Sequence, residues 1–276
     1  NHAGHPDQDD RRQEGRLVPR AQQVRDTGEL GCTSPAETHP PPLCSRPPVA
    51  QTYPTPPTAP QAYSKGQAEA HSKQFDMVND LRRQIADTST LRQMVSDGCK
   101  SPSSLRAGGD DPLAGSEAFA VMLRYYRLLC SMETRFEADD LRLQFPWKDA
   151  FQSHVKQGES DVRFERAAML WNLASLMSLA AMHMDRRDPE GIKRACLLYQ
   201  QTCSVLELLP PLVAATPWGG QTSVDLSKNM VECMQALMLA QAQRCFYEKA
   251  EREAMSPKLL AKIARGVADY YGEVSG

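Results

Sequence analysis

Beyond about residue 66, apolar residues recur every three to four positions, which is the spacing of amphipathic α-helices. This pattern predicts a first helical region up to a loop over residues 98–115, then helices over residues 117–136, 161–185, 189–209 and 227–254, and a last helix opening at Ser256 and Pro257. Asp161, Asp188 and Ser227 are predicted N-caps, because a side-chain oxygen at that position can accept a backbone N–H.

The predicted helices are rich in alanine, which lets neighbouring helices approach closely, and their connections are short. Short connections favour antiparallel neighbours. The sequence therefore predicts an all-α fold, a curved helical solenoid of the tetratricopeptide type, although no signature of that repeat is present. A single edge strand over residues 142–145 stays open, with no partner strand evident.

Residues 1–66 differ from the rest in composition, because Pro, Gln, Arg and Asp dominate there. Such a segment buries too little apolar surface to offset its chain entropy. We therefore expect a disordered, Pro-rich tail over residues 1–66 and a helical domain over residues 67–276.

The net charge of −2 and the pI of about 6.3 give no electrostatic reason to expect a nucleic-acid partner. No apolar run reaches the roughly 20 residues that a membrane-spanning helix requires. The eight cysteines are scattered and form no Cys-x-x-Cys pair. That usage is typical of a reducing compartment and predicts a cytoplasmic protein.

Catalytic and metal-binding patterns are absent from the sequence. The six histidines are isolated from one another, and there is no G-x-S-x-G, H-E-x-x-H or Walker loop. No pair of residues stands out as a general acid and base. We expect a protein that is not an enzyme and that carries no cofactor and no metal.

A series of short motifs follows in one order along the helical part. The motifs are Tyr125-Tyr126, residues 145–151 (FPWKDAF), 164–167 (FERA), 170–174 (LWNLA), 190–193 (EGIK), 224–227 (VDLS), 238–243 (MLAQAQ) and 268–271 (ADYY). From about residue 74 to residue 272, this series resembles the BRO domain of the Alix (programmed cell death interacting protein) family. That domain begins with short strands and continues with further helices, so the resemblance implies a domain incomplete at both ends.

The resemblance also implies a function. BRO domains are scaffolds of endosomal sorting and multivesicular-body formation, recruited from the cytoplasm to endosomes. They bind the C-terminal helix of ESCRT-III subunits, the charged multivesicular body proteins, in a helix-in-groove mode. An acidic contact position of the family falls on Pro189, a departure, with Glu190 adjacent. The other contact positions of the family fall on Lys193, Phe246, Lys249, Leu259 and Ile263.

Periodicity agrees with this site in part. The last helix carries two apolar stripes where a surface helix needs only one. One stripe holds Leu260, Ala264, Val267 and Tyr271, and the other holds Leu259, Ile263 and Tyr270. The surplus apolar surface is either core or the seat of a partner helix. Periodicity alone favours core, whereas the resemblance favours a partner.

A second motif lies in the Pro-rich tail. Pro57, Thr58, Ala59 and Pro60 match the P-T/S-A-P late-domain motif, which binds the ubiquitin-variant domain of ESCRT-I in families that carry it. An extended Pro-rich segment loses little entropy on docking, which suits such binding. The alternative interpretation of these four residues is a plain spacer.

Two other functions stay open. Rhophilin, a Rho-binding scaffold, and a tyrosine phosphatase share the BRO domain, so the chain could be the regulatory part of a signalling protein. A generic helical-repeat peptide binder is the other alternative. A curved helical face could also gather the dispersed Lys and Arg residues against an anionic membrane.

Overall fold

The computed structural model describes residues 72–100, 116–135, 144–219 and 222–275. The predicted tail over residues 1–66 lies outside this range. The elements are α3 (Ser72–Ala86), α4 (Thr88–Lys100), α6 (Glu117–Glu133), β1 (Phe145–Lys148), β2 (Lys156–Glu159), α7 (Val162–His183), α8 (Pro189–Leu206), α9 (Leu209–Ala214), the 3₁₀ helix η1 (Val224–Leu226), α10 (Lys228–Arg252) and α11 (Pro257–Ser275).

The predicted helix starts are largely confirmed. The side chain of Asp161 accepts the backbone N–H of Arg163 at the start of α7, and Ser227 accepts that of Met230 at the start of α10. Asp188 precedes α8 but makes no side-chain cap hydrogen bond. Each of the two confirmed caps satisfies a backbone donor that the helix itself leaves unpaired.

Two helix boundaries differ from the prediction. The first helical region divides at Asp87, whose carboxylate accepts the backbone N–H of Thr90 at 3.1 Å and starts α4. The helix predicted to reach residue 209 ends at Leu206. Pro210 and Pro211, directly after the predicted end of that helix, lie in the first turn of α9. A proline is tolerated there because its missing N–H would have no partner within the helix.

The described residues also contain a β-hairpin, whereas the sequence left open only a single edge strand over residues 142–145 with no partner. β1 and β2 pair antiparallel, with Phe145 opposite Glu159 and Lys148 opposite Lys156. The buried residues of β1 are Phe145 and Trp147, whereas β2 is a polar segment with no buried side chain. Because β2 lacks apolar alternation, it gives no strand signal on its own.

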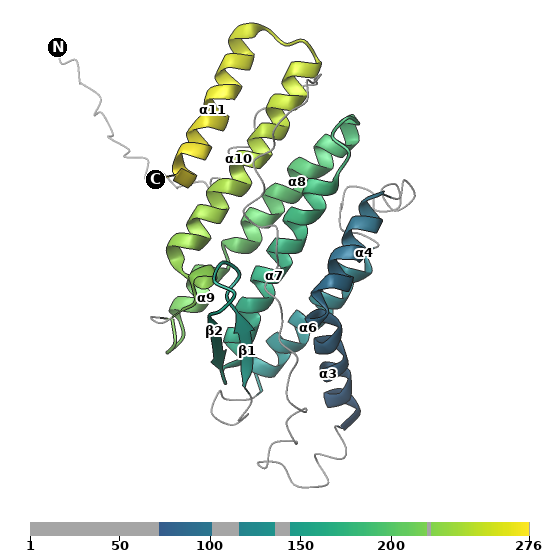
Figure 1. Cartoon of the computed structure of the whole chain (residues 1–276), viewed down its shortest axis with the longest axis vertical. Coiled ribbons are helices and arrows are strands. Elements are labelled where there is room, and N and C mark those ends of the chain that lie inside the picture. Colours follow the sequence, from purple (N-terminus) through teal and green to yellow (C-terminus); the bar gives the residue numbers. More distant parts are fainter. Residues whose placement is uncertain (1–71, 101–115, 136–143, 220–221, 276) are drawn as a thin grey trace, which may run out of the picture.

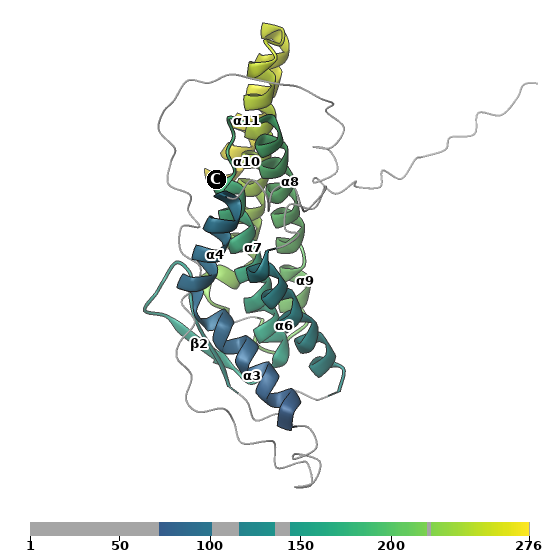
Figure 2. The same ribbon diagram turned by 90° about the vertical axis from the view of Figure 1, so that its right-hand side faces the viewer.

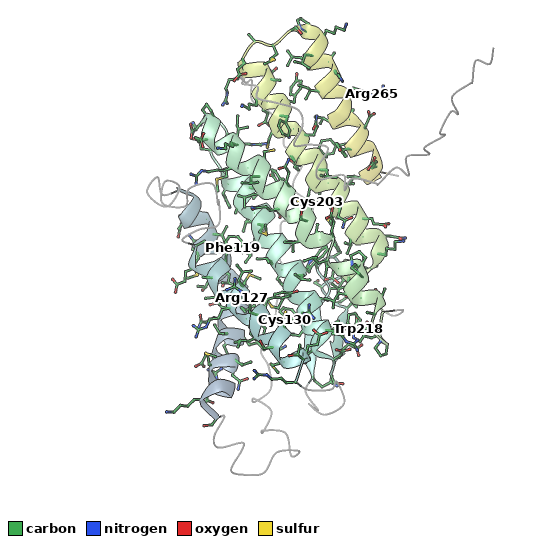
Figure 3. The ribbon with its side chains drawn as sticks, turned by 180° about the vertical axis from the view of Figure 1, so that it is seen from behind. Phe119, Arg127, Cys130, Cys203, Trp218 and Arg265 are labelled. Carbon is green, nitrogen blue, oxygen red and sulfur yellow. The ribbon has the colours of Figure 1, made fainter. Side chains whose placement is uncertain are left out.

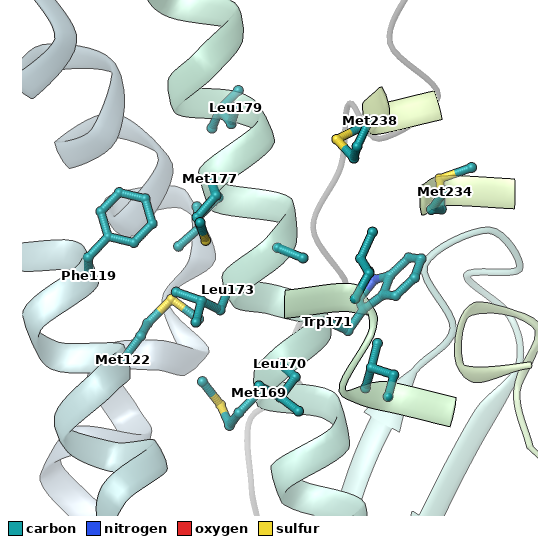
Figure 4. Close-up of a cluster of buried hydrophobic side chains, with 14 of the residues drawn as sticks. Phe119, Met122, Met169, Leu170, Trp171, Leu173, Met177, Leu179, Met234 and Met238 are labelled. Carbon is teal, nitrogen blue, oxygen red and sulfur yellow. The ribbon is translucent and has the colours of Figure 1, made fainter. Parts of the chain in front are cut away.

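The helices lie side by side in an elongated, layered array (Figure 1). α7 packs against α4 and α6 on one side and against α8 on the other, α8 then packs against α10, and α10 against α11. From Ala167 to Ala181 every residue of α7 is buried except Ser178. A helix buried on nearly all sides forms the core, and Figure 4 shows its side chains meeting those of α6 and α10. The all-α solenoid expected from the sequence is confirmed.

The α10–α11 hairpin extends past the ends of α7 and α8 in both views of the ribbon (Figures 1 and 2). Within the described residues, α11 makes its extensive contacts with α10 alone. The turn between them includes Ala254 at a φ of 50°, the left-handed region. This hairpin carries four of the five predicted contact residues.

Candidate protein-binding site

The register of α10 against α11 brings four predicted site residues to one level. The two helices are antiparallel: Cys233 Sγ donates to the carbonyl of Val274 at 3.7 Å, and the side chain of Gln243 lies against Gly266. Continuing that register toward the turn sets Phe246 beside Ile263 and Lys249 beside Leu259. All four therefore lie near the projecting end of the hairpin.

Lys193 reaches the same level from α8. This helix is antiparallel to α10, since Cys196 Sγ donates to the carbonyl of Ala242 at 3.7 Å and Arg252 donates to the carbonyl of Arg187 at 3.0 Å. Lys193 lies one turn from Cys196 toward this end. The structure thus brings all five predicted residues to a similar height on three helices, α8, α10 and α11, that pack side by side.

The start of α8 fits closely against the end of α7. A Cβ at Gly191 would lie 2.0 Å from the carbonyl oxygen of Asp185, so only glycine fits there without a backbone shift. Pro189, on which the acidic contact position of the family falls, and the adjacent Glu190 are both exposed. The carboxylate of Glu190 is thus accessible on the same turn as the departure at Pro189.

The five residues differ in exposure. Lys193 is exposed, and Phe246, Lys249 and Leu259 are partly buried. Ile263 is only 8% exposed. Since α10 is the helix against which α11 packs, Ile263 contributes to that interface and offers little surface to a partner. The apolar surface available at this level comes from Phe246 and Leu259.

Ion pairs tie the surrounding helix ends together. Glu248 on α10 accepts hydrogen bonds from Arg186, after α7, and from Arg244, each at 3.0 Å. Arg252 donates to the carbonyl oxygens of Arg186 and Arg187. These contacts fix the α7–α8 turn against α10 and so hold Lys193 at its height relative to Lys249.

Several residues of the motifs that carry the resemblance prove to be buried supports. Glu165, with no exposed surface, accepts hydrogen bonds from Tyr125 at 2.8 Å, from Trp147 at 2.6 Å and from Arg82 at 3.1 Å. Its donors come from α6, β1 and α3. One carboxylate on α7 therefore joins three other elements.

Two aspartates from different motifs form a reciprocal clasp. Asp149 accepts the backbone N–H groups of Val224 at 2.5 Å and of Phe151 at 2.7 Å, while Asp225 accepts that of Ala150 at 2.9 Å. Burial raises the pKa of Asp225 to about 6, opposed by its hydrogen bond from Ser223. The clasp joins the β1–β2 loop to η1, directly before α10.

A third buried acid joins the lower end of the bundle. Asp161 accepts a hydrogen bond from the indole of Trp218 at 3.3 Å and pairs with Arg163 at 2.8 Å. Figure 3 shows Trp218 at that end, far from the projecting hairpin. None of these three carboxylate clusters lies with the predicted binding residues.

The described residues hold no group of three or more His, Cys, Asp or Glu side chains arranged for a metal ion. Among the described cysteines, Cys196, Cys203 and Cys245 are buried free thiols, and burial raises the pKa of Cys245 to about 12. A thiol of that pKa is inert at neutral pH. Over the same residues, no helix is long and apolar enough to cross a bilayer. The Pro57–Pro60 motif lies outside the described part of the chain.

Comparison with known proteins decides the family. The family model described as BRO1-like domain matches residues 69–276. The chain belongs to this family. It is 30% identical over 217 residues to ALG-2 interacting protein X of Dictyostelium discoideum, covering 76% of this chain and 24% of that protein. It is likewise 30% identical over 217 residues to the vacuolar-sorting protein BRO1 of Arabidopsis thaliana, covering 74% of this chain and 25% of that protein.

Among solved structures, the ALIX BRO1 domain in complex with CHMP4C matches with a TM-score of 0.59 and 27% identity. The match covers 77% of this chain and 55% of that chain. The two relatives are thus about four times longer than the part matched here. The chain shares the family and the fold with these proteins. Its binding partners are the subject of the proposal below.

Proposed function

We propose that this BRO1-like domain is a non-catalytic adaptor that binds the C-terminal helix of an ESCRT-III subunit in endosomal sorting. The observation that carries the proposal is the common height of Lys193, Phe246, Lys249, Leu259 and Ile263 on α8, α10 and α11. The related ALIX domain, solved in complex with CHMP4C, supports the choice of partner.

The roles of the residues follow from their exposure. Phe246 and Leu259 offer the apolar contacts to one face of a partner helix, and Ile263 supports them from within the α10–α11 interface. Lys193 and Lys249 pair with acidic residues of the ligand. An amphipathic helix with apolar residues at three- and four-residue spacing and acidic flanks satisfies both requirements.

The test is a titration of the purified chain with a fluorescent C-terminal peptide of a charged multivesicular body protein. Leu259→Asp places a charge among the apolar contacts and is expected to weaken binding about 30-fold, as loss of a 2 kcal/mol hot spot does. Ala261→Asp is the matched control, because Ala261 is exposed on the same helix and turned away from Leu259. Ile263→Asp is a poor test, since a buried carboxylate would separate α11 from α10.

Charge contacts are tested separately. Lys193→Glu should weaken peptide binding several-fold and reduce its salt dependence, whereas Lys73→Glu on α3 should leave both unchanged. Both lysines are exposed. Equal affinity for the Leu259→Asp and Ala261→Asp chains, both shown to be folded by circular dichroism, would remove the site from α11.

The remaining parts of the proposal concern location and a second partner. We place the adaptor in the cytoplasm with recruitment to endosomes, in line with the vacuolar-sorting relative. The tail motif of Pro57, Thr58, Ala59 and Pro60 is proposed to bind ESCRT-I. Pull-down of ESCRT-I by the chain, lost on Pro57→Ala, is the expected result.

A further inference from the structure

The turn between α10 and α11 carries a hydroxyl group that the fold leaves unused. Ser256 and the following Pro257 are both exposed. Within the described part of the chain, the side chain of Ser256 makes no hydrogen bond, and only its backbone carbonyl accepts, from the N–H groups of Leu259 at 2.9 Å and Leu260 at 3.1 Å. Ser227, by contrast, uses its hydroxyl to cap α10. The hydroxyl of Ser256 is therefore available to another molecule.

The residue after Ser256 points to the kind of molecule. A Ser or Thr followed by Pro is the sequence on which proline-directed protein kinases act, because any other residue would leave its backbone N–H unpaired in the kinase pocket. The described residues contain two such pairs, Thr216-Pro217 and Ser256-Pro257. Thr216 is partly buried, and its hydroxyl donates to the carbonyl of Val213 at 2.6 Å. Of the two pairs, only that of Ser256 has an exposed and unbonded hydroxyl.

The position of the turn lets a kinase reach it. A kinase holds its substrate as an extended segment, so the first turn of α11 has to unwind briefly. The turn projects past the ends of α7 and α8 (Figures 1 and 2), and α11 has its extensive contacts with α10 alone among the described residues. Ala254 in this turn has a φ of 50°, which is unfavourable for a residue with a Cβ. A helix end with few contacts opens without unfolding the rest of the domain.

A phosphate on Ser256 would lie beside the proposed ESCRT-III site. Leu259 follows one helical turn after Ser256, a separation of about 5–6 Å between Cβ atoms, and Lys249 lies at the level of Leu259. The phosphate carries up to about two negative charges, and this separation is shorter than the screening length of about 8 Å. It would repel the acidic residues of the partner helix and compete with them for Lys249.

We propose that Ser256 is the acceptor of a proline-directed kinase and that its phosphate weakens binding of the ESCRT-III helix. The Ser256 Oγ attacks the γ-phosphorus of ATP, and the bond from that phosphorus to the β,γ-bridging oxygen breaks. ADP leaves, and the hydroxyl proton passes to the catalytic aspartate of the kinase. The effect on the partner rests on the proposed function, whereas the modification itself does not.

Phosphate mapping tests the acceptor site. The full chain, shown to be folded by circular dichroism, is incubated with ATP and either a cyclin-dependent kinase or a MAP kinase, and mass spectrometry locates the phosphate. We expect phosphate on Ser256 and none on Thr216. Pro257→Ala keeps the hydroxyl and should lower incorporation at Ser256 about ten-fold or more. A synthetic peptide of residues 251–262 is the control for the kinase.

Two mapping results would overturn the acceptor site. The first is a folded chain that takes up no phosphate on Ser256, whether or not the peptide is phosphorylated. The second is equal incorporation in the Pro257→Ala chain. Amide hydrogen exchange gives a readout of the modified chain that needs no partner. Since an anion at the start of a helix stabilises it, the amides of the first turns of α11 should exchange more slowly after phosphorylation.

The regulatory effect is measured by peptide titration. The kinase-treated chain is compared with a Ser256→Ala chain treated with the same kinase, so that the two share any phosphate at other positions. The phosphate on Ser256 should weaken binding about five-fold, and the difference should shrink at about 0.5 M salt. Equal affinities, in a chain whose binding Leu259→Asp does weaken, would overturn the regulation. If Leu259→Asp has no effect either, the proposed function has failed and the regulation fails with it, while the mapping still decides the acceptor site.

Discussion

Glu165→Gln removes a buried charge while keeping the side-chain shape, and the structure sets the size of the effect. The carboxylate has no exposed surface and accepts hydrogen bonds from Tyr125, Trp147 and Arg82, with Arg82 also 2.9 Å from it as an ion pair. A glutamine keeps one acceptor oxygen but turns an N–H₂ group toward donors. At least one hydrogen bond and the ion pair are then lost.

The magnitude follows from what remains buried. The Arg82 side chain is only 15% exposed, so its charge stays largely desolvated without a counter-ion. Breaking a buried ion pair by removing one partner costs about 3–5 kcal/mol. Because water reaches part of Arg82, we expect about 3 kcal/mol, a large fraction of the 5–15 kcal/mol typical of a domain.

Urea denaturation followed by circular dichroism measures this cost. Glu133→Gln is the matched control, since Glu133 pairs with Arg166 between α6 and α7 but both side chains are partly exposed. A pair of that kind is worth at most about 1 kcal/mol. A cost below about 1 kcal/mol for Glu165→Gln, or one equal to that of Glu133→Gln, would refute the reasoning.

Three further predictions follow. The pKa of Asp225 is about 6 when folded and about 3.8 when unfolded, so only the folded state takes up the proton as pH falls from 7 to 5. The unfolding free energy should therefore rise over that range, by about 1 kcal/mol, relative to an Asp225→Asn chain. Ser227→Ala should cost about 1 kcal/mol in denaturation, through loss of the α10 cap. In native alkylation followed by mass spectrometry, the buried Cys245 should react far more slowly than the partly exposed Cys130 and Cys233, and equal rates would contradict its burial.

Helix starts could be predicted because their cause is local. Asp161 and Ser227 cap the N–H groups of residues two and three positions later, so the sequence neighbourhood contains the whole interaction. The β1–β2 hairpin could not, because β2 is polar and gains its structure from pairing with β1 across a loop. A contact can therefore be predicted when both of its partners are close neighbours in the sequence, and not when they are separated by a loop.

The sequence predicted which residues form the candidate site but not how they are arranged in space. Their common height depends on the registers of α8 and α11 against α10, which no single helix pattern specifies. Burial of Ile263 is a further result of packing. Periodicity alone allowed the stripe of Ile263 to be either core or a partner surface. Ile263 is buried, and α11 packs against α10, so this residue belongs to the core.

The buried motif carboxylates act on the candidate site from a distance. Asp149 and Asp225 hold η1 directly before α10, and so set where this 25-residue helix begins. The position of Phe246, eighteen residues further along, depends on that start and on the packing of α10 against α8. Replacing either aspartate should therefore weaken the binding of a partner helix at the far end of α10 only indirectly, by loosening α10. The loss of affinity should then follow the loss of unfolding free energy. Leu259→Asp should weaken the binding of the same partner with little loss of unfolding free energy. Comparing the two measurements separates residues that hold the scaffold from residues that touch the ligand.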